Sequence, residues 1–284
     1  MKRDEAMKLA DEGITALNDA FKKGQSETLK RFLETVARFH HYSLNNALLI
    51  TSQRPDATRV AGFNAWRKLG RCVRKGERGI AIVAPMSCRK GGDEREMIVD
   101  DEQATVLGFR VVYVFDITQT DGEPILEFAA IRGDAAIWLP HLEIAVRESG
   151  VILEYAPIQF PMGAKGISTP GSIRIAPDLP ESEKFCVLAH EFAHELLHQR
   201  TERTKETTRQ VRETEAEAVA YTVCRAFGID STTHSSDYIQ LYQGTEDTLR
   251  ESLGFVQQAA THMIQEIRRR SDAKADSTTA VLAA

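Results

Sequence analysis

The sequence predicts an α+β fold, in which a small α/β domain is followed by a second domain of mixed helices and strands. Apolar residues recur at spacings of three and four over most of residues 1–50 and again after residue 180, which is typical of amphipathic helices. Between these regions, residues 79–85 and 105–117 are rich in β-branched and aromatic side chains, which favours strands.

The composition excludes several classes of protein. The chain has 284 residues, which as a prior allows about two domains. It is 42% hydrophobic and can bury a core, and its net charge of −5 excludes a uniformly basic DNA-coating protein. The four cysteines form no CxxC pair, so no disulfide framework is indicated. Because no run reaches the roughly 18 apolar residues of a membrane helix and the first residues lack an apolar signal core, we expect a soluble, cytoplasmic protein with no membrane partner.

The N-terminal elements follow from local composition. After the helices of residues 1–50, glycines and prolines separate short segments, and a polar loop is expected at 87–101 between the two strands. Turn residues at 118–124 then lead into a linker. We therefore divide the chain into a domain over 1–130, a domain over 131–270 and a disordered tail over 271–284.

The second domain is expected to begin with a helix at 137–149, followed by strands at 152–155 and 171–175. Two long helices are predicted over 181–198 and 207–227, and a further helix over about 247–270. The candidate chemistry of the chain lies on the two long helices.

The most informative pattern is the HExxH sequence that runs from His190 to His194. Residues four apart lie one turn apart on the same helix face, so both histidines can present a ring nitrogen to one metal ion. Glu191 projects from the same turn and can serve as general base toward a water molecule. Apolar neighbours predict that this helix is buried, and a bound metal would explain polar residues at such a place. Residues 173–175, just upstream, are interpreted as an edge-like strand, where zinc peptidases pair the substrate backbone.

A third metal ligand must come from another part of the chain. The metzincin pattern HExxHxxGxxH is excluded, because Leu197 replaces its glycine and Arg200 its last histidine. The following helix offers Glu213 and Glu217 one turn apart, whereas Glu215 points to a different face. We choose Glu213 as the ligand and Glu217 as the residue that orients a ligand histidine, with Glu217 as the alternative ligand. A charged, solvated helix face is the non-functional interpretation.

The remaining polar residues of this half are weaker candidates. His198 continues the row of histidines, but three positions over two turns span about 12 Å, too far for one tetrahedral ion. We interpret His198 either as a residue that contacts a metal ligand without binding the metal, or as a surface residue. Tyr221, His234 and Tyr238 could stabilise an oxyanion, with packing or simple exposure as the alternative. Two histidines and a glutamate favour Zn²⁺ over ions such as Mn²⁺.

The N-terminal half carries a basic stretch. Residues 54–90 contain ten basic and two acidic side chains, a local charge of +8 in a chain of net charge −5. Aromatic residues, among them Phe63 and Trp66, lie between the basic residues. Basic side chains that contact phosphates and aromatic rings that stack on nucleobases would suit the binding of single-stranded nucleic acid. The alternative is that the rings belong to the core and the charges form a solvated face.

Both halves resemble known families. The C-terminal half is similar to the ImmA/IrrE and ArdC-type zincin-like metallopeptidases, in which HExxH precedes a helix with the pattern that Glu213, Ala216, Glu217 and Ala220 reproduce. Ser236–Ile239 also resembles this group, and Glu195–His198 is closer to ImmA/IrrE than to ArdC. The N-terminal half resembles the ArdC-like single-stranded-DNA-binding domain in four segments, Tyr42–Leu49, Gly62–Trp66, Val73–Gly79 and Val114–Thr120. The resemblance covers roughly residues 10–265 in matching order.

This resemblance implies a DNA-binding domain followed by a zincin-like metallopeptidase domain, carried by a mobile element and active in anti-restriction or in protection of incoming DNA. The implied partners are single-stranded DNA, with duplex DNA as a second option, and an unidentified protein substrate. The candidate DNA-contacting residues are Tyr42, Asn45, Trp66, Arg67, Lys68, Arg74, Lys75 and Arg78.

Two alternative functions stay open. In the first, the protein is a non-proteolytic DNA-binding protector whose metal site is structural or vestigial. The presence of Glu191 favours catalysis, because a purely structural site does not need it. In the second, the protein cleaves one dedicated regulator and uses DNA binding as a sensor.

Overall fold

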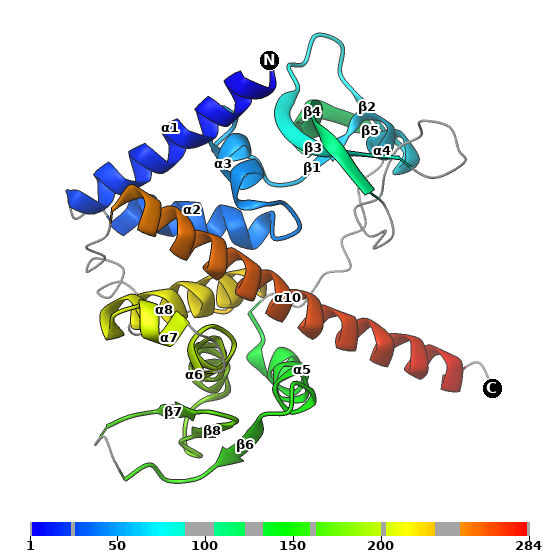
Figure 1. Cartoon of the computed structure of the whole chain (residues 1–284). Helices are drawn as coiled ribbons and strands as arrows, with labels where there is room; N and C mark the ends of the chain where they lie inside the picture. The colour runs from blue at the N-terminus through cyan, green and yellow to red at the C-terminus, as the bar shows by residue number, and fades with distance from the viewer. Residues whose placement is uncertain are drawn as a thin grey trace. The chain divides into compact units, whose positions relative to one another are not determined.

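The computed structural model describes residues 2–23, 26–88, 105–122, 133–159, 163–199, 203–230 and 245–282 (Figure 1). The elements of the first part of the chain are α1 (Arg3–Lys22), α2 (Ser26–Arg38), α3 (Leu44–Gln53), β1 (Val60–Gly62), α4 (Phe63–Lys68), β2 (Arg71–Val73), β3 (Ile80–Cys88), β4 (Thr105–Asp116), the short 3₁₀ helix η1 (Ile117–Gln119) and β5 (Thr120–Gly122). Those of the second part are α5 (Ala135–Glu148), β6 (Ile152–Tyr155), β7 (Gly166–Thr169), β8 (Ser172–Ile175), α6 (Glu181–His194), the π-helical turn η2 (Glu195–Gln199), α7 (Arg203–Glu206), α8 (Arg209–Ala226) and α10 (Glu246–Leu282).

The mixture of helices and small sheets confirms the predicted α+β class. Within the described ranges, no helix combines the length and the apolar character needed to cross a membrane.

The chain forms two compact units. Unit 1 contains Met1–Thr15 and Asn45–Ile125, and unit 2 contains Ala16–Leu44 and Leu126–Ala284. The sequence analysis placed residues 16–44 in the N-terminal domain, whereas here they cluster with the C-terminal part. The reason is α2, which packs its buried apolar face against α8 and α10. The boundary expected near residue 130 lies outside the described residues. Of the loop expected at 87–101, Ser87 and Cys88 belong to β3 and the rest lies outside the described residues.

Unit 1 is built on an antiparallel sheet of order β1–β4–β3, next to the two-stranded sheet β2–β5. The exposed edge of β3 is covered by two side-chain amides from α3. Asn46 donates to the carbonyl oxygen of Val83 and accepts from its N–H, both at 2.9 Å. Gln53 makes the same pair of bonds with Ala81, at 2.8 and 2.9 Å. The two amides therefore replace a neighbouring strand, because an open edge would leave backbone groups unpaired.

A buried carboxylate closes the other end of β4. Asp116 accepts four hydrogen bonds, from the backbone N–H groups of Thr58, Arg59 and Thr118 and from the Thr118 hydroxyl. Burial would raise the pKa of Asp116, but these hydrogen bonds outweigh it and lower the pKa. The carboxylate therefore holds the loop before β1 against η1.

Unit 2 contains a three-stranded sheet of order β6–β8–β7, in which β8 is parallel to β6 and antiparallel to β7. The expectation that residues 173–175 form an edge strand is therefore wrong. β8 is the central strand, and β7, which the sequence analysis did not identify, lies at the edge of the described sheet. Ile173 and Ile175 are fully buried, which explains the apolar character of β8.

Helix α6 lies between this sheet and α8 (Figure 1). Its apolar side chains Phe185, Leu188 and Phe192 are buried, and α8 presents the buried small residues Ala216 and Ala220. Small residues allow two helices to approach closely. This packing brings the polar side chains of α6 and α8 together.

Helix α10 is longer than the sequence predicts. It continues to Leu282, through most of the segment that was expected to be a disordered tail after residue 270. Its earlier part packs on α5 and α8 with Leu253, Val256, Ala260, Met263 and Ile264 buried. Helix α10 is therefore an integral part of unit 2.

Candidate metal centre

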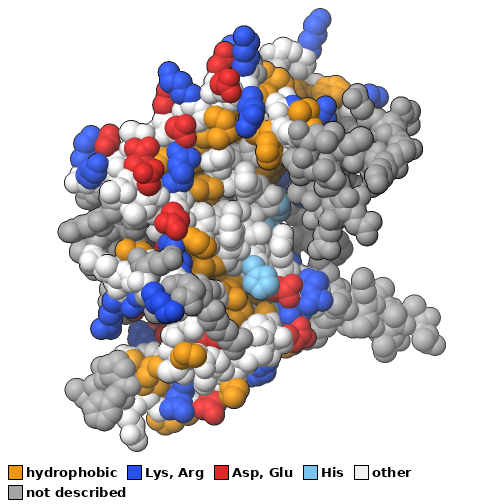
Figure 2. Space-filling view, in the orientation of Figure 1, with side chains coloured by type: hydrophobic (Ala, Val, Ile, Leu, Met, Phe, Trp, Pro, Cys, Tyr) orange, Lys and Arg blue, Asp and Glu red, His pale blue; other side chains and the backbone are white. Residues whose placement is uncertain are grey.

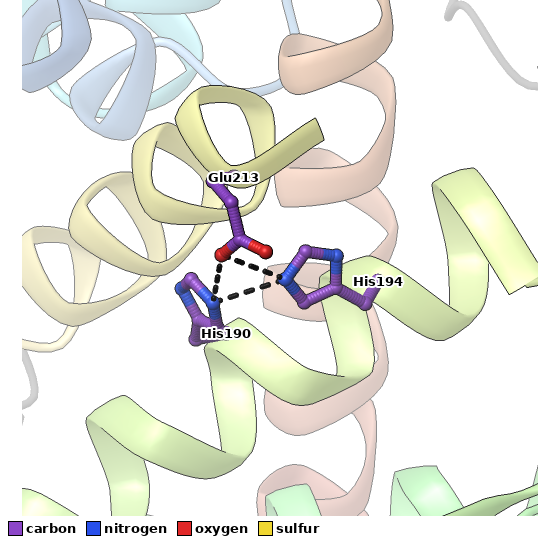
Figure 3. Close-up of side chains that lie close together, drawn as sticks. All are labelled: His190, His194 and Glu213. Atoms are coloured by element: carbon purple, nitrogen blue, oxygen red, sulfur yellow. Dashed lines mark hydrogen bonds and ion pairs between the residues drawn. The ribbon is translucent and has the colours of Figure 1, made fainter. Parts of the chain in front are cut away.

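Three side chains from α6 and α8 converge on one point in unit 2 (Figure 3). The Nε2 atoms of His190 and His194 are 3.1 Å apart. Glu213 Oε2 lies 3.6 Å from the first and 3.5 Å from the second. The structure therefore brings together the two histidines of HExxH and the glutamate that the sequence analysis selected as third ligand.

The triangle has the size that a tetrahedral ion requires. Zinc ligands at about 2.0–2.1 Å in tetrahedral geometry lie about 3.3–3.4 Å from one another. The three sides of this triangle, 3.1, 3.5 and 3.6 Å, are close to that value. Two nitrogens and one carboxylate oxygen also form a donor set that catalytic zinc uses together with one open position. The residues fit a divalent metal ion.

Glu217 lies beside the triangle rather than in it. Its Oε2 is 3.2 Å from Nδ1 of His190, on the side of the ring away from Glu213. A metal-binding histidine commonly donates its other N–H to a carboxylate, which fixes the tautomer and the orientation of the ring. This is the position of a residue that orients His190.

Without a metal, the cluster is stabilised by interactions between the His190 ring and the carboxylates of Glu213 and Glu217. Burial would lower the pKa of His190, but hydrogen bonds to Glu213 and Glu217 outweigh it and raise the pKa to about 10. The hydrogen bond from His190, with the ring of His194 close by, holds the pKa of Glu213 well below its usual range. In the folded, metal-free protein His190 is therefore a cation at pH 7, and its contribution to stability is present below pH 6.5 and is lost as the pH rises through about 10.

We expect zinc binding to release a proton and to strengthen with pH. A metal ligand must be neutral imidazole, so the ion displaces the proton of His190. The apparent affinity should rise by about tenfold per pH unit between pH 7 and 9. Chelator competition at several pH values measures the slope, and Glu217→Gln, which removes one of the groups that raise this pKa, should reduce it. A pH-independent affinity would show that His190 is already neutral.

Glu191 follows His190 on α6 and is 9% exposed. Burial raises its pKa, which moves a carboxylate toward the range in which it can exchange protons with water near neutral pH. The edge strand β7 lies directly against it and makes a backbone hydrogen bond from Ser168. A methyl group on Gly166 would lie 2.7 Å from the Glu191 Cγ, so this close approach requires glycine.

The sequence analysis did not find a second polar cluster behind the ligands. His198 is buried, and its Nδ1 lies 3.1 Å from Nδ1 of His194. Its Nε2 lies 2.9 Å from Glu215 Oε2, and Glu215 is in turn paired with the buried guanidinium of Arg203. Burial would raise the pKa of Glu215, but hydrogen bonds from His198 and Arg203 outweigh it and lower the pKa. The histidine spacing pointed to His198, but nothing local to the sequence pointed to Arg203.

The candidate DNA-contacting residues divide into different environments. Trp66 is 0% exposed, and its indole N–H donates to the carbonyl oxygen of Phe115 at 2.8 Å. Its ring is part of the core of unit 1 and is not placed to stack on a base, which corrects the interpretation made from the sequence. Arg74 is used within the unit, where it donates to Glu77 and to the carbonyl oxygen of Thr118. Tyr42 belongs to unit 2, where Gln257 donates to its carbonyl oxygen at 2.9 Å.

Other side chains of unit 1 are better placed for a ligand. Arg67, Lys68, Lys75 and Arg78 are exposed, and Asn45 is half-buried at the start of α3. Among the described residues of this unit, the exposed aromatic side chains are Phe63, Phe109 and Tyr113. On the face displayed in Figure 2, basic and acidic side chains are interspersed over the described part of the chain.

Of the three oxyanion candidates, only Tyr221 lies among the described residues, and its hydroxyl is paired with α2 rather than with the metal triangle. The hydroxyl of Tyr221 donates to Glu34 of α2 at 3.1 Å. His234, Tyr238 and the segment Ser236–Ile239 lie outside the described residues.

Comparisons with known proteins match a different family to each of two parts of the sequence. The family described as the IrrE N-terminal-like domain, a peptidase family, matches residues 155–225, which include both histidines, Glu191, Glu213 and Glu217. The second half therefore has a metallopeptidase-like domain. The N-terminal domain of anti-restriction factor ArdC matches residues 4–115. The sequence therefore combines a region that matches an ArdC-type N-terminal domain with a region that matches an IrrE-type domain.

Similar solved structures include two crystal structures of the antirestriction protein ArdC from plasmid R388. The metal-free one is 18% identical, with a TM-score of 0.46 over 80% of this chain and 83% of that chain. The Mn(II)-bound one is 19% identical, with a TM-score of 0.44 over 80% of this chain and 84% of that chain. No curated protein matches the sequence.

Proposed function

We propose that this protein is a zinc-dependent metallopeptidase whose N-terminal domain binds single-stranded DNA and which acts in anti-restriction. The observation that carries the enzymatic part is the triangle of His190, His194 and Glu213, with sides that suit a tetrahedral ion. Glu191 lies on the same helix beside the edge strand β7. These are the parts that metal-assisted peptide hydrolysis requires.

Each side chain has a distinct task in this proposal. The two histidines and Glu213 hold the ion, and Glu217 fixes the ring of His190. A bound zinc ion supplies Lewis acidity toward the carbonyl oxygen of a peptide. Glu191 accepts a proton from the attacking water and returns it to the leaving amine. The edge of β7 offers backbone groups that can pair with an extended substrate.

The DNA-binding part rests on unit 1. Its match to an anti-restriction factor and its exposed Arg67, Lys68, Lys75 and Arg78 support binding to a phosphate backbone. The exposed ring of Phe63 precedes two of these bases on α4 and can stack on a nucleobase. DNA binding would raise the concentration of the peptidase domain near proteins on exposed DNA.

The first test is the metal content of the full chain, measured by mass spectrometry for the wild type, Glu213→Ala and Glu217→Ala. We expect about one zinc per chain in the wild type and a loss of bound zinc in Glu213→Ala. Glu217→Ala should retain the site with an affinity about 10- to 100-fold weaker. Loss in Glu217→Ala alone would make Glu217 the third ligand. No metal in the wild type, even after zinc is supplied, would contradict the enzymatic proposal.

A second function is a DNA-binding protector that does not cleave proteins. The description of the N-terminal family as an anti-restriction factor favours it, because occlusion of DNA alone could block a nuclease. In that case the metal site would be structural or vestigial.

A further inference from the structure

The third histidine of the row has a defined relation to the metal triangle. His198 lies on the π-helical turn η2 that follows α6. Its Nδ1 faces Nδ1 of His194, at 3.1 Å, while Nε2 of His194 faces His190 and Glu213. On its other side, Nε2 of His198 faces Glu215 at 2.9 Å.

These contacts allow one arrangement of protons when both imidazoles are neutral. An ionised carboxylate only accepts hydrogen bonds, so His198 must carry its hydrogen on Nε2 and donate it to Glu215. Nδ1 of His198 is then an acceptor, and His194 must donate to it from Nδ1. This tautomer of His194 leaves Nε2 with a free lone pair that points into the metal triangle.

We propose that His198 is a positioning residue that, held by Glu215, selects the metal-binding tautomer of His194. The inference rests on the proposed metal site and extends it from Glu217 behind His190 to a matching partner behind His194. Each ligand histidine then has its second nitrogen fixed by a separate residue.

Arg203 holds the far end of this chain of contacts. Its guanidinium is buried and pairs with both carboxylate oxygens of Glu215, with Nε 3.2 Å from Oε2. It also lies 3.9 Å from the ring centroid of Phe255 and 3.2 Å from Glu251, both on α10. A buried carboxylate stays ionised when it is paired in this way. Helix α10 therefore supports the orientation of a metal ligand through Arg203, Glu215 and His198.

The test is the zinc affinity of the full chain, by chelator competition, for the wild type, His198→Leu, His198→Asn and His141→Leu. His198→Leu should bind zinc about 10- to 100-fold more weakly. In His198→Asn, the side-chain oxygen can still accept from His194, so we expect most of the affinity to return. His141, a buried histidine of α5, is the matched control and should have no effect. Wild-type affinity in His198→Leu would overturn the proposal.

A spectroscopic measurement separates this proposal from the metal proposal. Nitrogen NMR of ¹⁵N-histidine should place the hydrogen of His198 on Nε2 and that of His194 on Nδ1, with and without zinc. Glu215→Gln, whose amide can donate as well as accept, should weaken this preference. A hydrogen on Nδ1 of His198 in the wild type would overturn the proposal. If the wild type binds no zinc, the proposed function fails, and the tautomers of the metal-free protein still decide the role of His198.

Discussion

Glu191→Gln is expected to lower the rate of peptide hydrolysis by about 10²- to 10⁴-fold while the zinc content stays unchanged. Glutamine has the same shape, so it can occupy the buried position against β7, but it cannot accept a proton from water. Since Glu191 is not part of the metal triangle, the ion should stay in place.

The measurement uses a library of quenched peptides with the cleavage products identified by mass spectrometry, with and without single-stranded DNA. Glu181→Gln removes an exposed carboxylate from the first turn of the same helix and is the matched control. Cleavage by Glu191→Gln at the wild-type rate would exclude Glu191 as general base.

The same variant separates the two candidate functions. If proteolysis drives anti-restriction, Glu191→Gln should also lose the protection of an incoming plasmid from restriction. If occlusion of DNA is sufficient, the variant should protect as well as the wild type. Full protection with no cleavage would favour the non-proteolytic protector.

The metal triangle could be predicted because its geometry is almost entirely local. His190 and His194 share a helix face by their spacing, and so do Glu213 and Glu217 on α8. The only long-range step was the pairing of α6 with α8, which the alanines of α8 and the apolar face of α6 made plausible. Five of the six side chains that organise the site, counting His198 and Glu215, lie one helix turn from another member, and only Glu215 does not.

The support behind the triangle could not be predicted in the same way. Arg203 reaches Glu215 from α7 and contacts α10, so its role depends on the tertiary arrangement of three helices. Likewise, an amphipathic α2 requires a partner, but its sequence does not say that the partner is unit 2. A stretch of basic and aromatic residues also does not indicate which of its rings are buried. This ambiguity is why Trp66 and Phe63 looked equivalent in the sequence.

Trp66→Ala and Phe63→Ala should therefore affect different properties: the first should lower stability, and the second should weaken DNA binding. Trp66→Ala removes a fully buried indole and its hydrogen bond to the Phe115 carbonyl, and should lower the free energy of unfolding of unit 1 by about 3–5 kcal/mol. Phe63 is 48% exposed, so its replacement should change that free energy by at most about 0.5 kcal/mol. If its ring stacks on a base, Phe63→Ala should weaken binding of a single-stranded oligonucleotide by about 1–3 kcal/mol.

Denaturant unfolding followed by circular dichroism and oligonucleotide binding followed by fluorescence anisotropy separate these effects. DNA binding should also weaken as the salt concentration increases, because the exposed Arg and Lys side chains of unit 1 would replace counterions on the phosphates. A Trp66→Ala protein of wild-type stability that binds DNA poorly would return Trp66 to the DNA interface. Wild-type binding by Phe63→Ala would remove its ring from that interface. Because both aromatic residues belong to α4, that result would leave Arg67 and Lys68 as the residues of this short helix that can contact DNA.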